Sequence, residues 1–95
     1  MLDRLVGFDW DVNNIAHITR HGVTPADVEQ ATARRHVIVP SAAKMKEERW
    51  KLLGTTNAGR YLVVVFTIRK NKFRTVTAYT MNQVERRVYA PHIDA

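Results

Sequence analysis

The first third of the chain carries apolar and small side chains at the spacing of helices. Asp11 is a good N-cap and Gly22 is a typical residue for ending a helix. Between them, apolar and small side chains recur with the helical period: Val12, Ile15, Ala16 and Thr19. A second start signal follows, with Thr24 as the cap and Pro25 at the first helical position. This second helix is expected to run to about Ala33. The sequence therefore predicts two short helices in succession.

From residue 36 onwards the pattern changes to the twofold period of strands. Residues 36–39 predict a short strand, and residues 48–55 alternate between apolar and polar side chains. Residues 60–68 follow a glycine turn and contain the unbroken run Leu-Val-Val-Val-Phe, which is typical of a central strand covered on both faces. A polar turn separates this strand from the last one, at residues 73–80. Consecutive strands joined by short turns predict an antiparallel meander of three to four strands.

The chain ends in a third helical pattern. Asn82 and Glu85 are spaced as a capping box, and Pro91 is expected to end the short helix that they open. Two N-terminal helices, an antiparallel meander and a short C-terminal helix make an α+β domain. A length of 95 residues without a repeat or a linker is expected to form one domain, spanning residues 1–95.

Charge is distributed unevenly along the sequence. Residues 1–33 carry two basic and five acidic side chains, whereas residues 34–95 carry thirteen basic and four acidic ones, and the net charge is +6. This basic balance suits a polyanionic partner, either a nucleic acid or an acidic protein, although solubility alone also explains it. The absence of cysteine excludes disulfides and thiolate chemistry, and no apolar run is long enough for a membrane span. A cytoplasmic protein without a cofactor or metal is expected.

Strand alternation collects basic and hydroxyl side chains on one face of the predicted sheet. Alternation in the last strand groups Arg74 with Val76 and Ala78. The opposite face receives the remaining side chains: Phe73, Thr75, Thr77 and Tyr79. If Trp50 and Ala78 pack on the helices, a cationic floor forms on the other face: Arg49, Lys51, Thr77 and Tyr79. The basic turn beside this floor adds Arg69, Lys70 and Lys72. A solvated face with polar edge protection is the alternative.

A cationic floor suits cleavage of RNA without a metal ion. The ribose 2′-hydroxyl is the nucleophile, so the protein needs only to position the chain and to stabilise the charged phosphorane with arginine and lysine. Lys51 is one candidate base, because neighbouring cations such as Arg49 lower a lysine pKa. His21 is the other candidate, although a histidine at the end of a helix also caps carbonyls and complements the helix dipole.

Three blocks of the sequence resemble the BrnT-type toxins, a family of small bacterial ribonucleases. The blocks are Phe8-Asp-Trp-Asp11 with Arg20-His-Gly-Val23, then Glu48-Arg49 with Gly54 and Gly59-Arg60, and finally Arg74 to Ala78 with Glu85-Arg86-Arg87. The resemblance implies a fold like that of the RelE-type mRNA-cleaving toxins. It also implies a cognate ribbon-helix-helix antitoxin as partner, and DNA binding only through the toxin–antitoxin complex. The candidate catalytic residues are therefore the four of the floor together with His21 and Arg86: Arg49, Lys51, Thr77, Tyr79, His21 and Arg86. The residues expected to contact RNA are Arg60, Arg69, Lys70, Lys72 and Arg74.

We therefore expect a metal-independent endoribonuclease toxin that cleaves mRNA and is neutralised by its antitoxin. In the last strand the family motif reads Ser-Ala-Arg, whereas this chain has Thr77-Ala78-Tyr79. The phenol in place of a guanidinium offers one neutral hydrogen bond to a phosphate, or a surface on which a base stacks. Two alternatives stay open: a non-catalytic, antitoxin-binding member of a repressor complex, and an RNA-binding module without a partner.

Overall fold

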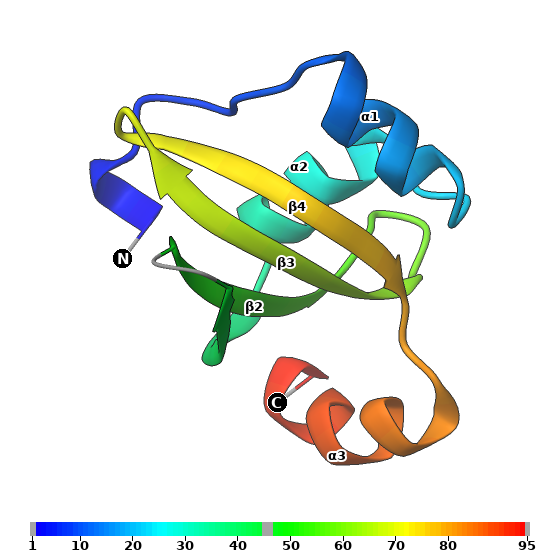
Figure 1. The fold of residues 1–95 in the computed structure, drawn as a ribbon. Coiled ribbons are helices and arrows are strands. Elements are labelled where there is room, and N and C mark those ends of the chain that lie inside the picture. The colour runs from blue at the N-terminus through cyan, green and yellow to red at the C-terminus, as the bar shows by residue number, and fades with distance from the viewer. Residues whose placement is uncertain (1, 45–46, 95) are drawn as a thin grey trace.

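The computed structural model describes residues 2–44 and 47–94, with helices and strands in the predicted order (Figure 1). One turn of 3-10 helix and two α-helices come first: η1 (Leu2–Arg4), α1 (Val12–Thr19) and α2 (Pro25–Ala33). Four strands follow: β1 (His36–Lys44), β2 (Glu47–Thr55), β3 (Tyr61–Arg69) and β4 (Lys72–Thr80). The last element is α3 (Gln83–Asp94). The predicted α+β class, with its meander and C-terminal helix, is confirmed.

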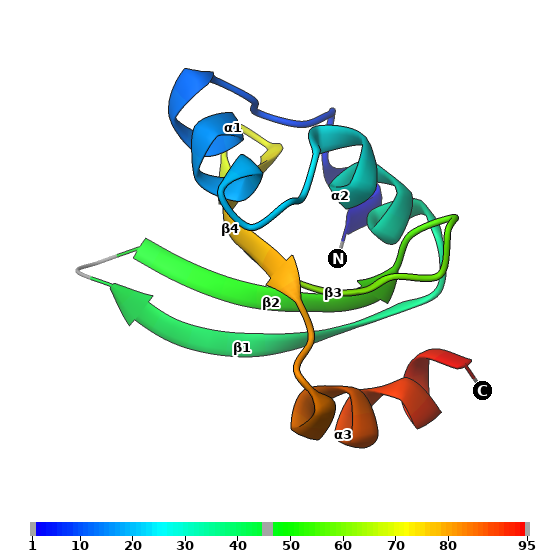
Figure 2. The ribbon, with the colours of Figure 1, turned by 90° about the vertical axis from the view of Figure 1, so that its right-hand side faces the viewer.

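The four strands form one antiparallel sheet in the order β1-β2-β3-β4. Helices α1 and α2 lie on one face, which we call the inner face, and α3 lies on the opposite, outer face (Figure 2). The main core fills the inner face, where Ile18, Val28 and Phe66 are fully buried. As predicted for a central strand, β3 is buried on both faces, with no exposed surface on Val63 or Val64. No helix in the described part of the chain is long and apolar enough to cross a membrane.

The start of α1 is confirmed, but its buried side differs from the prediction. Asp11 and Asn14 form a capping box in which each side chain accepts a hydrogen bond from the other residue's backbone N–H. The helix buries Asn14 and Ile18, whereas Val12 is 83% exposed. The other residues that the helical spacing predicted on the buried side are also exposed: Ile15, Ala16 and Thr19. The side-chain amide of Asn14 donates to the carbonyl oxygen of Asp9 at 2.8 Å, so this polar contact decides which side of the helix faces inwards.

Helix α2 begins and ends where predicted, but α3 is longer than expected. The predicted capping box opens α3, and the helix then continues through Pro91 to Asp94. Ile93 is only 4% exposed, and the Tyr61 hydroxyl donates to the Asp94 carboxylate at 2.6 Å. These two contacts hold the last turn against the sheet, so Pro91 lies inside the helix instead of ending it.

A bulge in β4 changes which side chains share a face. The register of β4 against β3 shifts by one residue between Thr75 and Thr77, so Val76 is an extra residue in the strand. Phe73 and Thr75, which are 2% and 1% exposed, therefore lie on the inner face, and Arg74 lies on the opposite side from them. The predicted alternation is wrong for this half of the strand, because a bulge interrupts the twofold period.

The segment before α1 runs beside β4. The backbone N–H of Asp9 donates to the carbonyl oxygen of Phe73, and the N–H of Phe73 donates to that of Gly7, both at 2.9 Å. Lys70 and Asn71 both have positive φ, so the β3–β4 hairpin closes with a tight two-residue turn. This arrangement places the acidic start of the chain next to the basic start of β4.

Candidate active site

Register places the predicted floor on the outer face of the sheet. One row across the sheet holds Lys51, Val65 and Thr77, and the next row holds Leu53, Val63 and Tyr79. Tyr79 lies in the part of the outer face that α3 covers, where it packs with Leu53, Val63 and Ile93. The floor thus divides into an apolar half under α3 and a polar half that continues towards Arg49.

A polar hollow of about 200 Å³ lies where α1 faces the start of β2, the end of β3 and the start of β4. We call it the arginine hollow, because Arg49 and Arg74 both line it. Three further polar residues in its lining enter the argument: His17, Glu47 and Thr75. Two guanidinium groups in one hollow present several N–H donors, which is the arrangement that binds the oxygens of a phosphate.

Carboxylates fix both arginines of this hollow. Arg74 Nη2 lies 2.9 Å from Asp11 Oδ2 and its Nη1 lies 3.4 Å from Asp9 Oδ2, while Arg49 Nε lies 2.9 Å from Glu47 Oε2. The backbone N–H at the third position of α1 lowers the pKa of Asp11, and the Arg74 guanidinium lowers it further. Asp11 therefore caps α1 and orients Arg74 at the same time, so that less side-chain freedom is lost when an anion binds.

Thr75 adds a buried hydroxyl to the same hollow. Its side chain is 1% exposed, and its Oγ1 has no hydrogen-bond partner within residues 2–44 and 47–94. Buried hydroxyls in proteins nearly always have a partner, because an unsatisfied one costs about 1–3 kcal/mol. The Thr75 hydroxyl therefore has a hydrogen-bonding capacity that no described residue uses.

Two histidines connect the hollow to Tyr79. The ring of His17, which lines the hollow, lies 6.2 Å from the ring of His21, and His21 meets the ring of Tyr79 edge-on at 6.4 Å. Burial raises the pKa of the Tyr79 hydroxyl, and the nearby carboxylate of Glu85 raises it further, so this hydroxyl is a donor at neutral pH. Its oxygen lies 3.5 Å from Glu85 Oε2. The structure thus brings together His21 and Tyr79, which the sequence analysis proposed on separate grounds.

Two of the predicted arginines lie elsewhere and bind other parts of the protein. The guanidinium of Arg86 lies 4.3 Å above the ring of Tyr61. Tyr61 is four residues, or about 13 Å, along β3 from Val65, the residue that pairs with Lys51. Arg60 donates to three acceptors: the carbonyl oxygen of Gly22 (2.9 Å), Thr80 Oγ1 (2.9 Å) and Asp27 Oδ2 (3.4 Å). Arg60 therefore joins the loop before α2 to the end of β4, and a catalytic role for Arg86 stays a prediction.

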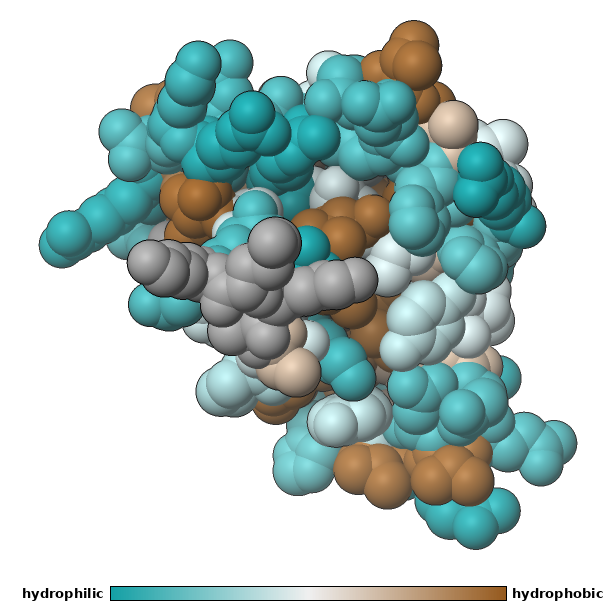
Figure 3. Space-filling view, in the orientation of Figure 1, coloured by the Kyte–Doolittle hydropathy of each residue, from teal (hydrophilic) through white to brown (hydrophobic). Residues whose placement is uncertain are grey.

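The basic turn continues the arginine hollow. A second hollow, of about 240 Å³, is lined by Asp9, Asp11 and four basic side chains: Arg69, Lys70, Lys72 and Arg74. Because Arg74 lines both hollows, a basic track leads from the β3–β4 turn to the arginine hollow. Hydrophilic side chains gather over this turn in the space-filling view (Figure 3).

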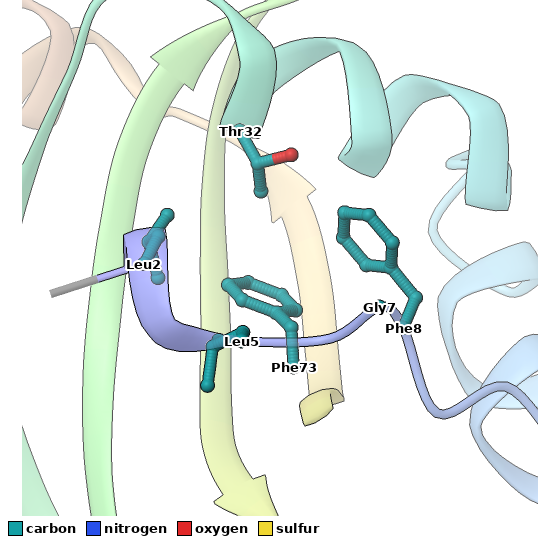
Figure 4. Close-up of a pocket in the computed structure, with 6 residues that line it drawn as sticks. All are labelled: Leu2, Leu5, Gly7, Phe8, Thr32 and Phe73. Atoms are coloured by element: carbon teal, nitrogen blue, oxygen red, sulfur yellow. The ribbon is translucent and has the colours of Figure 1, made fainter. Parts of the chain in front are cut away.

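A third hollow, of about 230 Å³, differs in character. It lies between η1, α2 and β4, where Leu2, Leu5, Phe8 and Phe73 surround it (Figure 4). The only side-chain hydroxyl in its lining, that of Thr32, already donates to the carbonyl oxygen of Glu29 at 2.8 Å. The lining contains no titratable group, so this hollow is not a candidate for acid–base chemistry.

Sequence reasoning did not find His17 or Thr75. The spacing of His17 and His21, four residues apart, was the available signal, because residues at this spacing lie on one side of a helix. Thr75 carried no such signal, since its place on the inner face depends on the bulge that follows it in β4.

Comparison with known protein families identifies the chain. This fold, with two arginines and a histidine lining a polar hollow, defines a small α+β protein with a candidate anion-binding site. The family model described as ribonuclease toxin, BrnT, of type II toxin-antitoxin system matches residues 10–85. The chain therefore belongs to the BrnT family of ribonuclease toxins, as its sequence blocks suggested, and family membership implies an RNA substrate and an antitoxin partner. A comparison with proteins of curated function gave no match.

Proposed function

We propose that this protein is a metal-independent endoribonuclease that cleaves mRNA, with the scissile phosphate in the arginine hollow. Arg49 and Arg74 bind the non-bridging oxygens and stabilise the charge that develops on the phosphorane. The Thr75 hydroxyl donates a further hydrogen bond to the same group. The two guanidinium groups that carboxylates orient in one hollow are the observation that carries this proposal.

The histidine pair supplies the proton transfers. His17 accepts the proton of the ribose 2′-hydroxyl as that oxygen bonds to phosphorus, and His21 gives a proton to the 5′-oxygen as the bond from phosphorus to that oxygen breaks. The products are a 2′,3′-cyclic phosphate and a 5′-hydroxyl. Lys51 and Thr77, one row along the outer face, contact the neighbouring phosphate, and the basic turn binds the chain beyond the hollow.

Cleavage in the presence of a chelator tests this proposal. The protein, freed of any partner, is expected to cut single-stranded RNA in EDTA and to leave a 2′,3′-cyclic or 3′-phosphate. His17→Ala should lower the rate by about 10²-fold or more, because general acid–base catalysis contributes at least that factor. Arg35→Ala, an exposed arginine far from the hollow in sequence, is the control and should cleave normally. A requirement for magnesium, or a 3′-hydroxyl product, would refute the mechanism.

We also propose that the antitoxin is a ribbon-helix-helix protein, that it neutralises the toxin in the cytoplasm, and that only the complex binds DNA. The basic residues of the chain support an acidic partner, since complementary charge speeds association. Co-expression with the protein encoded by the adjoining reading frame should yield a stable complex that binds promoter DNA. If the complex forms but neither it nor the toxin cuts RNA, the chain is the non-catalytic member of a repressor complex.

A further inference from the structure

Helix α3 is apolar on both of its sides. Its inward side carries Tyr89 and Ile93, which pack on the outer face of the sheet. Its outward side carries Val84 and Val88, one turn apart, with 65% and 53% of their surfaces exposed. Pro91 follows at the next position on the same side and is also exposed. An amphipathic surface helix normally turns its apolar stripe to the core and polar residues to solvent, so a second apolar stripe on the solvent side is unusual.

The outward side of α3 forms a visible surface patch. Hydrophobic side chains show over α3 at the bottom of the space-filling view (Figure 3). Helical geometry places Arg87 and His92 on the two flanks of the valine stripe, and both are exposed. Both acidic residues of this helix already have partners: Glu85 caps the helix and lies near the Tyr79 hydroxyl, and Asp94 accepts a hydrogen bond from the Tyr61 hydroxyl. The patch is therefore an apolar stripe with a basic border.

We propose that this stripe, made of Val84, Val88 and Pro91, is where the antitoxin docks, through a segment with apolar side chains flanked by carboxylates. The inference rests on the type II toxin–antitoxin pairing of the proposed function. A second copy of this chain fits the stripe less well, because a symmetric contact would bring Arg87 close to its own copy on a protein of net charge +6. An acidic segment instead covers the valines and pairs with Arg87.

The stripe and the arginine hollow are made of different residues. The hollow is lined from α1 and from β2, β3 and β4, with no residue of α3 in its lining. Substitutions on the outward side of α3 should therefore separate antitoxin binding from RNA cleavage. The family model ends at Glu85, so most of this stripe lies beyond the part of the chain that it covers.

Single aspartate substitutions provide the test, with the protein encoded by the adjoining reading frame as the probe. Val84→Asp and Val88→Asp in the 95-residue chain should each weaken binding of that protein by at least about 30-fold, the loss expected when a charge replaces a hot-spot residue of an interface. Both variants should cut RNA as the wild type does. Val12→Asp is the matched control, because Val12 is an 83% exposed valine at the start of α1 and receives the same change of charge. This control should bind the partner normally.

Each contrary outcome has a distinct meaning. If both α3 variants bind as tightly as the wild type, or if Val12→Asp weakens binding equally, the proposed docking site is wrong. If light scattering finds the wild-type chain dimeric on its own and Val88→Asp monomeric, the stripe is a contact between copies and the proposal fails. If the wild-type chain does not bind the probe while it still cuts RNA, the partnership stated under Proposed function is what fails, and the docking site falls with it.

Discussion

At Thr75, the side chain that would give the most stable protein differs from the one that the proposed function needs. Its buried hydroxyl lacks a partner in the described part of the protein, although the same position would accept an isosteric valine without loss of volume. A chain under selection for stability alone has no use for such a hydroxyl. The proposed function gives this polar side chain a role, because it assigns the hydroxyl to the phosphate of the substrate.

Thr75→Val should therefore change stability and activity in opposite directions. We expect the free protein to gain about 1 kcal/mol, because the unsatisfied hydroxyl disappears, and RNA cleavage to fall by about 10-fold, because one hydrogen bond to the phosphate is lost. Urea unfolding and single-turnover cleavage measure the two effects. Thr75→Ser keeps the hydroxyl and should retain cleavage. A valine variant that cleaves normally would show that the hydroxyl does not bind substrate.

The residues of the site could be predicted only where local rules hold. Alternation placed Lys51, Thr77 and Tyr79 on one face correctly, because their part of the sheet is regular. The same rule failed for Arg74 and Thr75, because the extra residue of the bulge lies between them and the regular part of β4. Bulges depend on contacts between strands, so a sequence period cannot reveal them.

At the scale of elements, α2 approaches the sheet closely through Gly54. A Cβ atom added to Gly54 would lie 3.1 Å from the carbonyl oxygen of Ala31 and 3.4 Å from its Cβ. Both residues are buried, and the contact lies where α2 crosses β2. The absence of a side chain at Gly54 therefore sets the distance between α2 and the sheet.

Gly54→Ala should destabilise the protein by about 1–3 kcal/mol, because an extra methyl in a tight contact forces the helix away from the sheet. The free energy of unfolding, measured in urea, checks this. Gly59, at φ 88° in the β2–β3 turn, has open space around it, so its substitution tests backbone conformation and not the distance between elements. An alanine at position 54 that leaves the unfolding midpoint unchanged would contradict the close approach.

Capping residues predicted where the helices begin more reliably than hydrophobic spacing predicted which side of a helix is buried. The three predicted capping residues, Asp11, Thr24 and Asn82, each bind the backbone as expected, since a cap depends only on residues three positions apart. The buried side of α1 depended instead on a hydrogen bond from Asn14 to the segment that runs beside β4. The length of α3 depended on a contact from Tyr61, more than thirty residues away. Tertiary contacts of this kind override local preference.

At the scale of the whole molecule, folding turns the uneven charge of the sequence into a localised basic surface. Acidic residues of the first third pair with arginines of the sheet, as Asp27 does with Arg60 and Asp11 with Arg74. These pairs neutralise part of the basic charge and leave the β3–β4 turn as a concentrated region, with exposed Lys70 and Lys72. RNA should therefore bind along one track instead of over the whole surface.

The salt dependence of RNA binding tests this track. For single strands, log K falls with log salt by about 0.7 for each phosphate that a basic residue neutralises. Lys72→Ala should weaken binding and reduce this slope by about that amount, because Lys72 lies on the track beside Arg74. Arg35→Ala removes the same charge from an exposed position next to β1 and should leave the slope unchanged. Fluorescence anisotropy with a labelled RNA, titrated at several salt concentrations, measures both variants against the wild type. Equal slopes for the two variants would mean that RNA responds to net charge alone, and the turn would then have no special place in binding.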